Sequence, residues 1–167
     1  MYARSAAFYD AIYAAIGMVD FELGERFDVM VCLFGSIGYV VSTDRLQAAV
    51  QNMQQHLLPG GLLVIEPWLR PEDYNVGVVH AAFVDQPDLK VVRMNVSDRR
   101  APNISVLNFH YLVAKPDGVQ YFSERHELGL FSHAEYLAAL AASGMEVIYE
   151  AQGLIGRGIY IGRNLRL

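Results

Sequence analysis

Two apolar runs in the sequence end in side chains that could hold a small molecule. The run 27–34 leads into Gly-Ser-Ile-Gly-Tyr at 35–39, and the run 62–65 leads into Glu-Pro-Trp at 66–68. Nearly unbroken apolar runs are typical of strands buried on both faces of a parallel sheet. Open α/β sheets bind ligands beyond the carboxyl ends of such strands. We therefore expect the two strand ends to form the floor of one cleft.

Each polar side chain in these segments also has a structural explanation, and the sequence leaves both open. Ser36 can stabilise the turn in which it lies, or it can contact a ligand there. Glu66 ends an apolar strand, so it is either a ligand contact or a hydrogen-bonded structural acid. Trp68 is the only tryptophan of the chain. Its ring could stack on a base or sugar, or pack against the strands that follow.

The residue spacing argues against several other kinds of site. The five histidines show no paired-ligand spacing and one cysteine cannot build a thiolate site, so no metal site is predicted. Gly-Ser-Ile-Gly around Ser36 is not the Gly-x-Ser-x-Gly elbow of hydrolases. The glycine clusters at 60–61 and 153–158 precede predicted strands, the opposite order from a dinucleotide-binding loop. His56, near a helix end, is expected to interact with the last helical carbonyls.

Length and composition favour one globular domain over residues 1–167. The chain is 53% hydrophobic and carries a formal net charge of −5, which argues against disorder and against nucleic acid as a partner. The single cysteine, Cys32, rules out an internal disulfide and is expected to be a buried thiol. The most apolar stretch, 29–41, is shorter than the ~20 residues of a membrane helix. We therefore expect a soluble, cytoplasmic protein with no membrane partner.

Hydrophobic periodicity predicts a βαβ unit in the first half of the chain. A short helix is expected at 5–16, before the strand at 27–34. The next helix is capped by Ser42 or Thr43, and Pro-Gly-Gly at 59–61 stops it before a strand at 62–66. The two strands should be parallel, with a right-handed crossover. One face of that helix carries Leu46, Ala49, Val50, Met53 and Leu57.

The second half of the sequence indicates an antiparallel extension, a helix and two closing strands. β-Branched and aromatic residues predict antiparallel strands at 91–96, 104–113 and 119–130, with a turn at 115–118. A capping box from Ser132 to Glu135 opens a helix at 133–143 that ends at Gly144. Strands at 145–150 and 158–162 complete the chain. The expected fold class is therefore α/β with an antiparallel β extension.

Several motifs together resemble class I S-adenosylmethionine-dependent methyltransferases, especially the N,N-dimethyltransferases of nucleotide-linked amino sugars in antibiotic pathways. Leu-Pro-Gly-Gly at 58–61 is common to the superfamily, whereas Glu-Pro-Trp at 66–68 and Gly-Arg-Gly at 156–158 are more specific. The resemblance covers nearly the whole chain. The other matching segments are Tyr9-Asp10-x-x-Tyr13, Met18-Val19-Asp20-Phe21, the stretch 26–39, His110-Tyr111, Arg125-His126 and Leu130-Phe131.

One segment of the family pattern is missing. In the family, the N-terminal helix is followed by a strand with an acidic Gly-x-Gly loop and a second strand that ends in an acid, which bind the methyl donor. Here Gly17 stands where the adenine-contacting aspartate would be, directly before Met18. The implied fold is a truncated Rossmann-like methyltransferase sheet with an antiparallel β extension. Without the missing strands, 27–34 is expected to form an exposed apolar edge, which either lets chains associate into homo-oligomers or makes the protein poorly soluble.

The resemblance implies methyl transfer from S-adenosylmethionine to a small-molecule acceptor, the amine of a nucleotide-linked sugar. Losing several donor contacts of ~1–3 kcal/mol each predicts weakened donor binding. The alternatives are a non-catalytic nucleotide-sugar binding module and an inactive fragment. Arg157 is either a bidentate contact to pyrophosphate or a solvated turn arginine. The residues assigned by resemblance are Tyr13 and Glu66 for catalysis, Met18, Phe34 and Tyr39 for the donor, and Tyr13, Ser36, Glu66, Trp68 and Arg157 for the acceptor.

Overall fold

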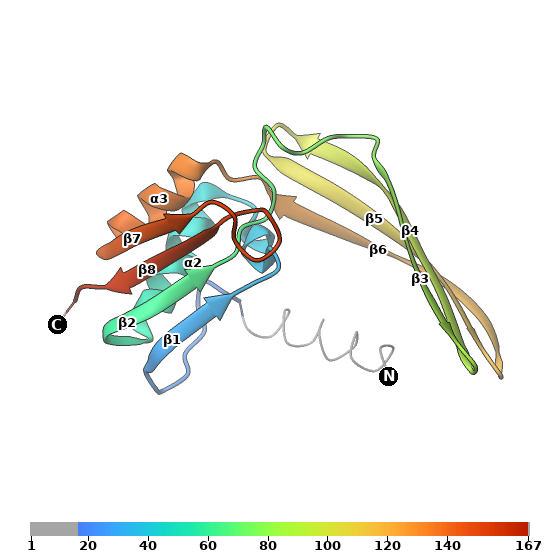
Figure 1. The fold of residues 1–167 in the computed structure, drawn as a ribbon, viewed down its shortest axis with the longest axis horizontal. Helices are drawn as coiled ribbons and strands as arrows, with labels where there is room; N and C mark the ends of the chain where they lie inside the picture. Colours follow the sequence, from blue (N-terminus) through green and yellow to red (C-terminus); the bar gives the residue numbers. More distant parts are fainter. Residues whose placement is uncertain (1–16, 167) are drawn as a thin grey trace.

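The computed structural model describes residues 17–166, which form two four-stranded sheets, two α-helices and one 3-10 helix (Figure 1). The expected helix at 5–16 lies outside the described residues. The first sheet has the order β1 (Phe27–Cys32), β2 (Leu57–Ile65), β8 (Ile159–Asn164), β7 (Met145–Glu150). The second has the order β3 (Val79–Gln86), β4 (Leu89–Ala101), β5 (Ile104–Lys115), β6 (Gly118–Gly129). The helices are η1 (Ser36–Val40), α2 (Thr43–Gln55) and α3 (His133–Ala142).

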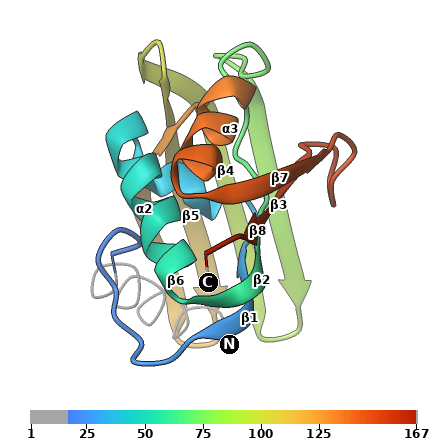
Figure 2. The ribbon, with the colours of Figure 1, turned by 90° about the vertical axis from the view of Figure 1, so that its left-hand side faces the viewer.

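β1 and β2 form the parallel pair that the βαβ pattern predicts. Val29 pairs with Leu62 and Cys32 pairs with Ile65, so the two strands end side by side. β8 pairs antiparallel with β2, and β7 pairs antiparallel with β8. Figure 2 shows α2 and α3 together on one face of this sheet. The expected Rossmann-like sheet is therefore confirmed, and the expected antiparallel extension is the second sheet.

The core lies between these two helices and the first sheet. Leu46, Ala49 and Val50 of α2 are fully buried, as the helical periodicity predicts. Leu63 and Ile65 of β2 are fully buried opposite them. Burying an aliphatic side chain of this size stabilises the folded state by about 1.5–3 kcal/mol. This packed layer therefore holds β2 firmly against α2.

Two helix termini differ in how well the sequence predicts them. α3 begins with the predicted capping box, in which Ser132 Oγ accepts from the Glu135 amide and the Glu135 carboxylate accepts from the Ser132 amide. α2 ends at Gln55 rather than at Pro59, and Pro-Gly-Gly at 59–61 lies inside β2. His56 supplies the stop instead, because its Nδ1 lies 2.9 Å from the Asn52 carbonyl oxygen.

The second sheet is an antiparallel meander that extends away from the first (Figure 1). Its β5–β6 hairpin turns where predicted, with Lys115 paired to Gly118, and Gly118 has a φ of 140°. The sequence did not predict β3, and all eight of its residues are exposed. The sheet meets the rest of the molecule at η1, where a Cβ on Gly38 would lie 3.0 Å from the Cβ of Leu128 in β6.

β1 is an edge strand of the first sheet within residues 17–166. Val29 is 51% and Val31 is 61% exposed, so the expectation of burial on both faces is wrong for this strand. The predicted exposed apolar edge is present, because no described strand pairs with the outer side of β1. In the described part of the chain, every helix is too short or too polar to cross a lipid bilayer.

Candidate functional site at the ends of β1 and β2

The ends of the two parallel strands meet, as the sequence predicts. The Glu66 amide donates to the Cys32 carbonyl oxygen at 2.8 Å, which extends the β1–β2 pairing by one residue. The Phe34 amide then donates to Glu66 Oε2 at 2.6 Å. This hydrogen bond is short and runs from the second residue after β1 to the residue directly after β2, so Glu66 joins the two strand ends.

The chain makes a sharp corner directly after β1. Phe34 has a φ of 56° and Gly35 a φ of 73°, both in the left-handed region. Glycine accepts this conformation freely, whereas phenylalanine adopts it at a cost of about 1–2 kcal/mol. The hydrogen bond to Glu66 holds Phe34 in place, and its side chain is 72% exposed beyond the strand.

Gly35 allows three segments to come together at this corner. A Cβ on Gly35 would lie 2.8 Å from Trp68 Cε3 and 3.4 Å from a terminal nitrogen of Arg157. The Arg157 guanidinium carbon lies 4.5 Å from the Trp68 ring centroid, a cation–π distance. The glycine-rich turn at 153–158 is therefore folded against the ends of β1 and β2.

Trp68 links the two sheets. Its Nε1 donates to Ser105 Oγ of β5 at 3.0 Å, and Ser105 Oγ in turn donates to the Leu128 carbonyl oxygen at 3.0 Å. Of the two roles that the sequence left open, the structure shows packing against the antiparallel extension. The Arg157 guanidinium lies over the ring, so the indole is contacted at Nε1 and on its face.

Arg157 is half-buried rather than a fully solvated turn residue. Burial lowers the pKa of its guanidinium, and the negative charge of Glu66 acts in the opposite direction. Arg157 and Glu66 are therefore close enough for their charges to interact at this corner. An arginine that is partly desolvated binds an anion more strongly than one in bulk water.

Glu66 is fully buried, with an exposed fraction of 0%. Its Oε1 has no hydrogen-bond partner among residues 17–166. A buried carboxyl oxygen without a partner has unused capacity to accept a hydrogen bond. Both roles stay open for Glu66, since Oε2 has a structural partner and Oε1 has none in the described chain.

Ser36 and Tyr39 lie on η1, at the same corner. Ser36 Oγ donates to the Leu33 carbonyl oxygen at 2.8 Å, as expected for a turn serine. The Tyr39 hydroxyl lies 2.7 Å from Nδ1 of His126 in β6, and the His126 Nε2 lies 3.5 Å from a Glu124 carboxylate oxygen. This chain of polar groups connects η1 to the second sheet.

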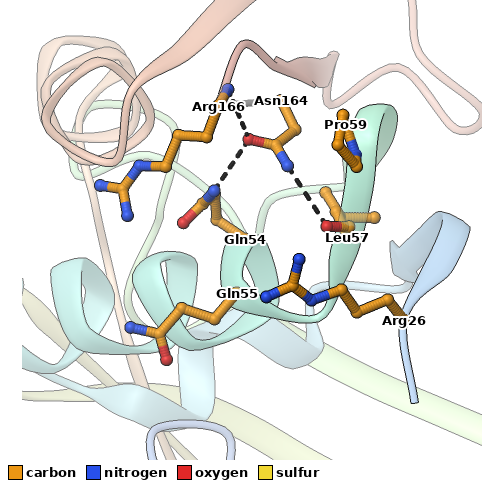
Figure 3. Close-up of a pocket in the computed structure, with 7 residues that line it drawn as sticks. All are labelled: Arg26, Gln54, Gln55, Leu57, Pro59, Asn164 and Arg166. Carbon is orange, nitrogen blue, oxygen red and sulfur yellow. Dashed lines mark hydrogen bonds between the residues drawn. The ribbon is translucent and has the colours of Figure 1, made fainter.

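The remaining predicted residues are less closely tied to the corner. Met18 is half-buried, packs against the core, and its carbonyl oxygen accepts from Asn52 Nδ2 at 3.4 Å. Tyr13 lies outside the described residues. A half-open cavity of about 160 Å³ lies elsewhere, lined by residues such as Arg26 and Asn164 (Figure 3).

Sequence reasoning missed the contributions of the second sheet to this region. Ser105 and Glu124 were not singled out, and His126 was noted only as part of a matching motif. Tyr39 and His126 are 87 positions apart, so no local spacing could connect them. The only available signal was the strand pattern that placed an antiparallel extension next to Trp68.

Comparisons with known proteins agree with this architecture, although no protein-family model matches the chain. The chain is 42% identical over 146 residues, 87% of its length, to the Streptomyces venezuelae dTDP-3-amino-3,4,6-trideoxy-alpha-D-glucopyranose N,N-dimethyltransferase, of which it covers 61%. The sugar N-methyltransferase KedS8 from Streptoalloteichus has a TM-score of 0.83 at 39% identity, with 90% of this chain and 61% of that one covered. SAM-bound CalS10, an amino pentose methyltransferase from Micromonospora echinaspora, has a TM-score of 0.78 at 35% identity, with 89% and 63% covered.

The chain spans about 60% of the length of the curated relatives that it matches. This partial coverage agrees with the predicted lack of a segment that family members have. The matched part includes most of this chain, and the sequence and structural likenesses point to the same group of proteins. By sequence and fold, the chain is similar to S-adenosylmethionine-dependent methyltransferases, and its homologues are N,N-dimethyltransferases of nucleotide-linked amino sugars.

Proposed function

We propose that this chain acts in methyl transfer from S-adenosylmethionine to the amine of a nucleotide-linked sugar. The names of its relatives support this reaction, since they include N,N-dimethyltransferases of dTDP-linked amino sugars. The observation that carries the proposal is the meeting of the β1 and β2 ends, with Glu66, Trp68 and Arg157 within one corner. In an open α/β sheet this is where ligands bind.

The acceptor side of the proposed site contains Ser36, Glu66, Trp68 and Arg157, together with Tyr13. Arg157 is suited to the pyrophosphate, because a guanidinium contacts phosphate oxygens bidentately. Its position over the Trp68 ring restricts its conformations, so less entropy is lost when it binds an anion. The unpartnered Oε1 of Glu66 is the acceptor atom that a sugar amine or hydroxyl would use, after a small movement that exposes it.

The donor side would be bordered by Phe34, Tyr39 and Met18. Phe34 presents its ring to solvent beyond β1, and Tyr39 is 40% exposed on η1, so both are accessible to a flat ligand group. The donor supplies an electrophilic methyl group when it is bound. The chain's own contribution would be to orient the acceptor amine and to take up its proton, for which Glu66 and Tyr13 are the proposed groups.

A second candidate function is a nucleotide-sugar binding module without catalysis. β1 is an edge strand in residues 17–166, so the described chain offers no further parallel strand whose end could bind the donor ribose. The acceptor residues do not depend on such a strand. With this function, the chain would bind the nucleotide-linked sugar but would not transfer a methyl group to it.

Two measurements on one preparation separate these functions. Calorimetry with dTDP-3-amino-3,4,6-trideoxy-alpha-D-glucopyranose measures acceptor binding, and transfer of a labelled methyl group from S-adenosylmethionine measures the reaction. Binding together with transfer supports the enzyme, and binding without transfer supports the module. Absence of both, in protein with native circular dichroism, contradicts both functions and leaves an inactive fragment.

We also propose that the chain forms homo-oligomers through the exposed edge of β1. Val29 and Val31 give this edge an apolar character, and an unpaired strand offers free backbone donors and acceptors to a second copy. Sedimentation velocity tests this association, since a single monomeric species at all concentrations would contradict it.

The proposed function also places the protein in the cytoplasm, because the free, buried thiol of Cys32 suits a reducing compartment.

A further inference from the structure

The cavity of about 160 Å³ lies at the opposite end of the first sheet from the corner at Glu66. It opens where β2 begins, where β8 ends and where α2 finishes (Figure 3). Ser36, Glu66, Trp68 and Arg157 do not line it. The proposed methyl-transfer site therefore leaves this cavity unexplained.

The charge of the lining is unusual for this chain. Arg26 and Arg166 line the cavity, and none of the lining residues is acidic, although the chain has 18 acidic and 13 basic side chains. Both arginines are exposed, and within residues 17–166 neither forms an ion pair. Two unpaired guanidiniums around one hollow create a local positive potential in an acidic protein.

The floor of the cavity is a fixed network of amides. Gln54 and Asn164 are 3% and 4% exposed, and Gln54 Nε2 donates to Asn164 Oδ1 at 2.8 Å. Asn164 Oδ1 also accepts from the Arg166 amide at 3.2 Å, which fixes the chain that carries the Arg166 side chain. A floor held in this way cannot adapt freely, so the cavity is preorganised.

Several carbonyl oxygens around the cavity already have donors. Asn164 Nδ2 donates to the Leu58 carbonyl oxygen at 3.1 Å and to that of Leu57 at 3.3 Å. His56 contacts the last carbonyl oxygens of α2 through its amide and its Nδ1. His56 therefore satisfies several of the last carbonyl oxygens of α2, and the two guanidiniums are the charged groups that line the cavity.

One acceptor in the floor has no donor. Gln54 Oε1 is buried and forms no hydrogen bond within the described chain, while Nε2 of the same amide is held by Asn164. A buried polar atom without a partner costs about 1–3 kcal/mol. A ligand that carries both acceptor oxygens and one donor would suit the two arginines and this amide together.

We propose that this cavity is a binding site for a small phosphate group, either inorganic phosphate or the phosphate of a monoester. The phosphate oxygens accept from Arg26 and Arg166, for which the guanidinium fork is the geometric match. The hydroxyl of a monoprotonated phosphate donates to Gln54 Oε1, once the exposed Arg166 side chain shifts to admit it. The volume accommodates one phosphate group but not a whole nucleotide sugar, so this ligand is distinct from the proposed methyl acceptor.

The test is a titration of the ¹⁵N-labelled full chain with inorganic phosphate at low ionic strength, followed by NMR. The side-chain amide signals of Gln54, Gln55 and Asn164 report directly on the cavity. Parallel titrations use glycerol 2-phosphate, to distinguish a monoester from free phosphate, and acetate, to detect unspecific anion binding. The variants are Arg26→Gln and Arg166→Gln, with Arg45→Gln as the matched control because Arg45 is an exposed arginine of α2 outside the cavity.

Saturable shifts centred on these three amides are expected, with affinity about 10-fold or more weaker in each cavity variant and unchanged in the control. The absence of saturation up to about 10 mM phosphate would overturn the proposal, as would equal binding of acetate or equal weakening by Arg45→Gln. Arg157→Gln separates this site from the proposed function. It should leave these shifts unchanged, whether or not the chain binds a nucleotide sugar.

Discussion

Replacing Gly35 by alanine tests whether the corner after β1 is as closely packed as the structure shows. The new methyl group would lie 2.8 Å from Trp68 Cε3 and 3.2 Å from Trp68 Cα. The second contact is with backbone, which cannot rotate away. The residue would also have to keep a φ of 73°, which alanine adopts at a cost of about 1–2 kcal/mol.

The packing cost and the backbone cost of the substitution add up in the free energy of unfolding. Overpacking of a buried contact costs about 1–3 kcal/mol, so Gly35→Ala should lower the free energy of unfolding by about 2–5 kcal/mol in total. Domains are stable by about 5–15 kcal/mol, so the variant should still fold but unfold at clearly lower urea concentration. Trp68 should also change its emission in the native state, because the clash displaces the ring from Ser105 and Arg157.

Gly60→Ala is the matched control for this experiment. Gly60 has a φ of 79°, but a Cβ there would meet no atom within 4 Å. The control therefore carries the backbone cost of about 1–2 kcal/mol without the packing cost. Urea unfolding followed by far-UV circular dichroism and by Trp68 emission measures both variants. Equal destabilisation of the two, with native Trp68 emission in Gly35→Ala, would refute the described packing.

The other predictions concern the cap of α3, the core, the thiol and the edge strand. Ser132→Ala removes the capping box and should cost about 1 kcal/mol in urea unfolding, whereas a change below about 0.3 kcal/mol would contradict the observed cap. Leu46→Ala should cost about 2.7–5 kcal/mol by the same measurement, because Leu46 is fully buried, and a surface-like loss would contradict its place in the core. Burial raises the pKa of the Cys32 thiol to about 11, so the folded protein holds its proton more tightly than the unfolded chain. As the pH rises from 9 to 11, stability should therefore fall by about 2 kcal/mol more than in Cys32→Ala, and parallel curves for the two proteins would exclude this cause. Val31→Lys places a charge on the exposed edge strand and should shift sedimentation toward monomer, and unchanged association would place the contact elsewhere.

Local sequence patterns were sufficient for the elements whose determinants are close together in the chain. The apolar face of α2 was predictable because Leu46, Ala49 and Val50 recur at helical spacing. The capping box of α3 and the turn before Gly118 were predictable because their hydrogen bonds and dihedral angles depend on neighbouring residues. The parallel pairing of β1 with β2 followed from the strand–helix–strand order.

Features that depend on distant parts of the chain were not predictable. β3 was missed because its residues are exposed and lack the apolar alternation that marks a half-buried strand. Pro-Gly-Gly at 59–61 suggested a helix stop, yet the segment lies in β2, since backbone pairing with β1 begins at Leu57. For the site, the strand ends around Ser36 and Glu66 were predictable from position, but Tyr39–His126 and Trp68–Ser105 required the placement of the second sheet.

In the proposed function, the ends of β1 and β2, with Arg157, form the place where a nucleotide-linked sugar binds. Trp68 is the only tryptophan and contacts Arg157, so the emission of the chain reports on the surroundings of this one ring. A titration with dTDP-3-amino-3,4,6-trideoxy-alpha-D-glucopyranose should change Trp68 emission saturably, with at least 10-fold weaker affinity in Arg157→Gln and unchanged affinity in Arg45→Gln. Unchanged Trp68 emission in the folded wild-type chain, or equal affinity in Arg157→Gln, would contradict the claim.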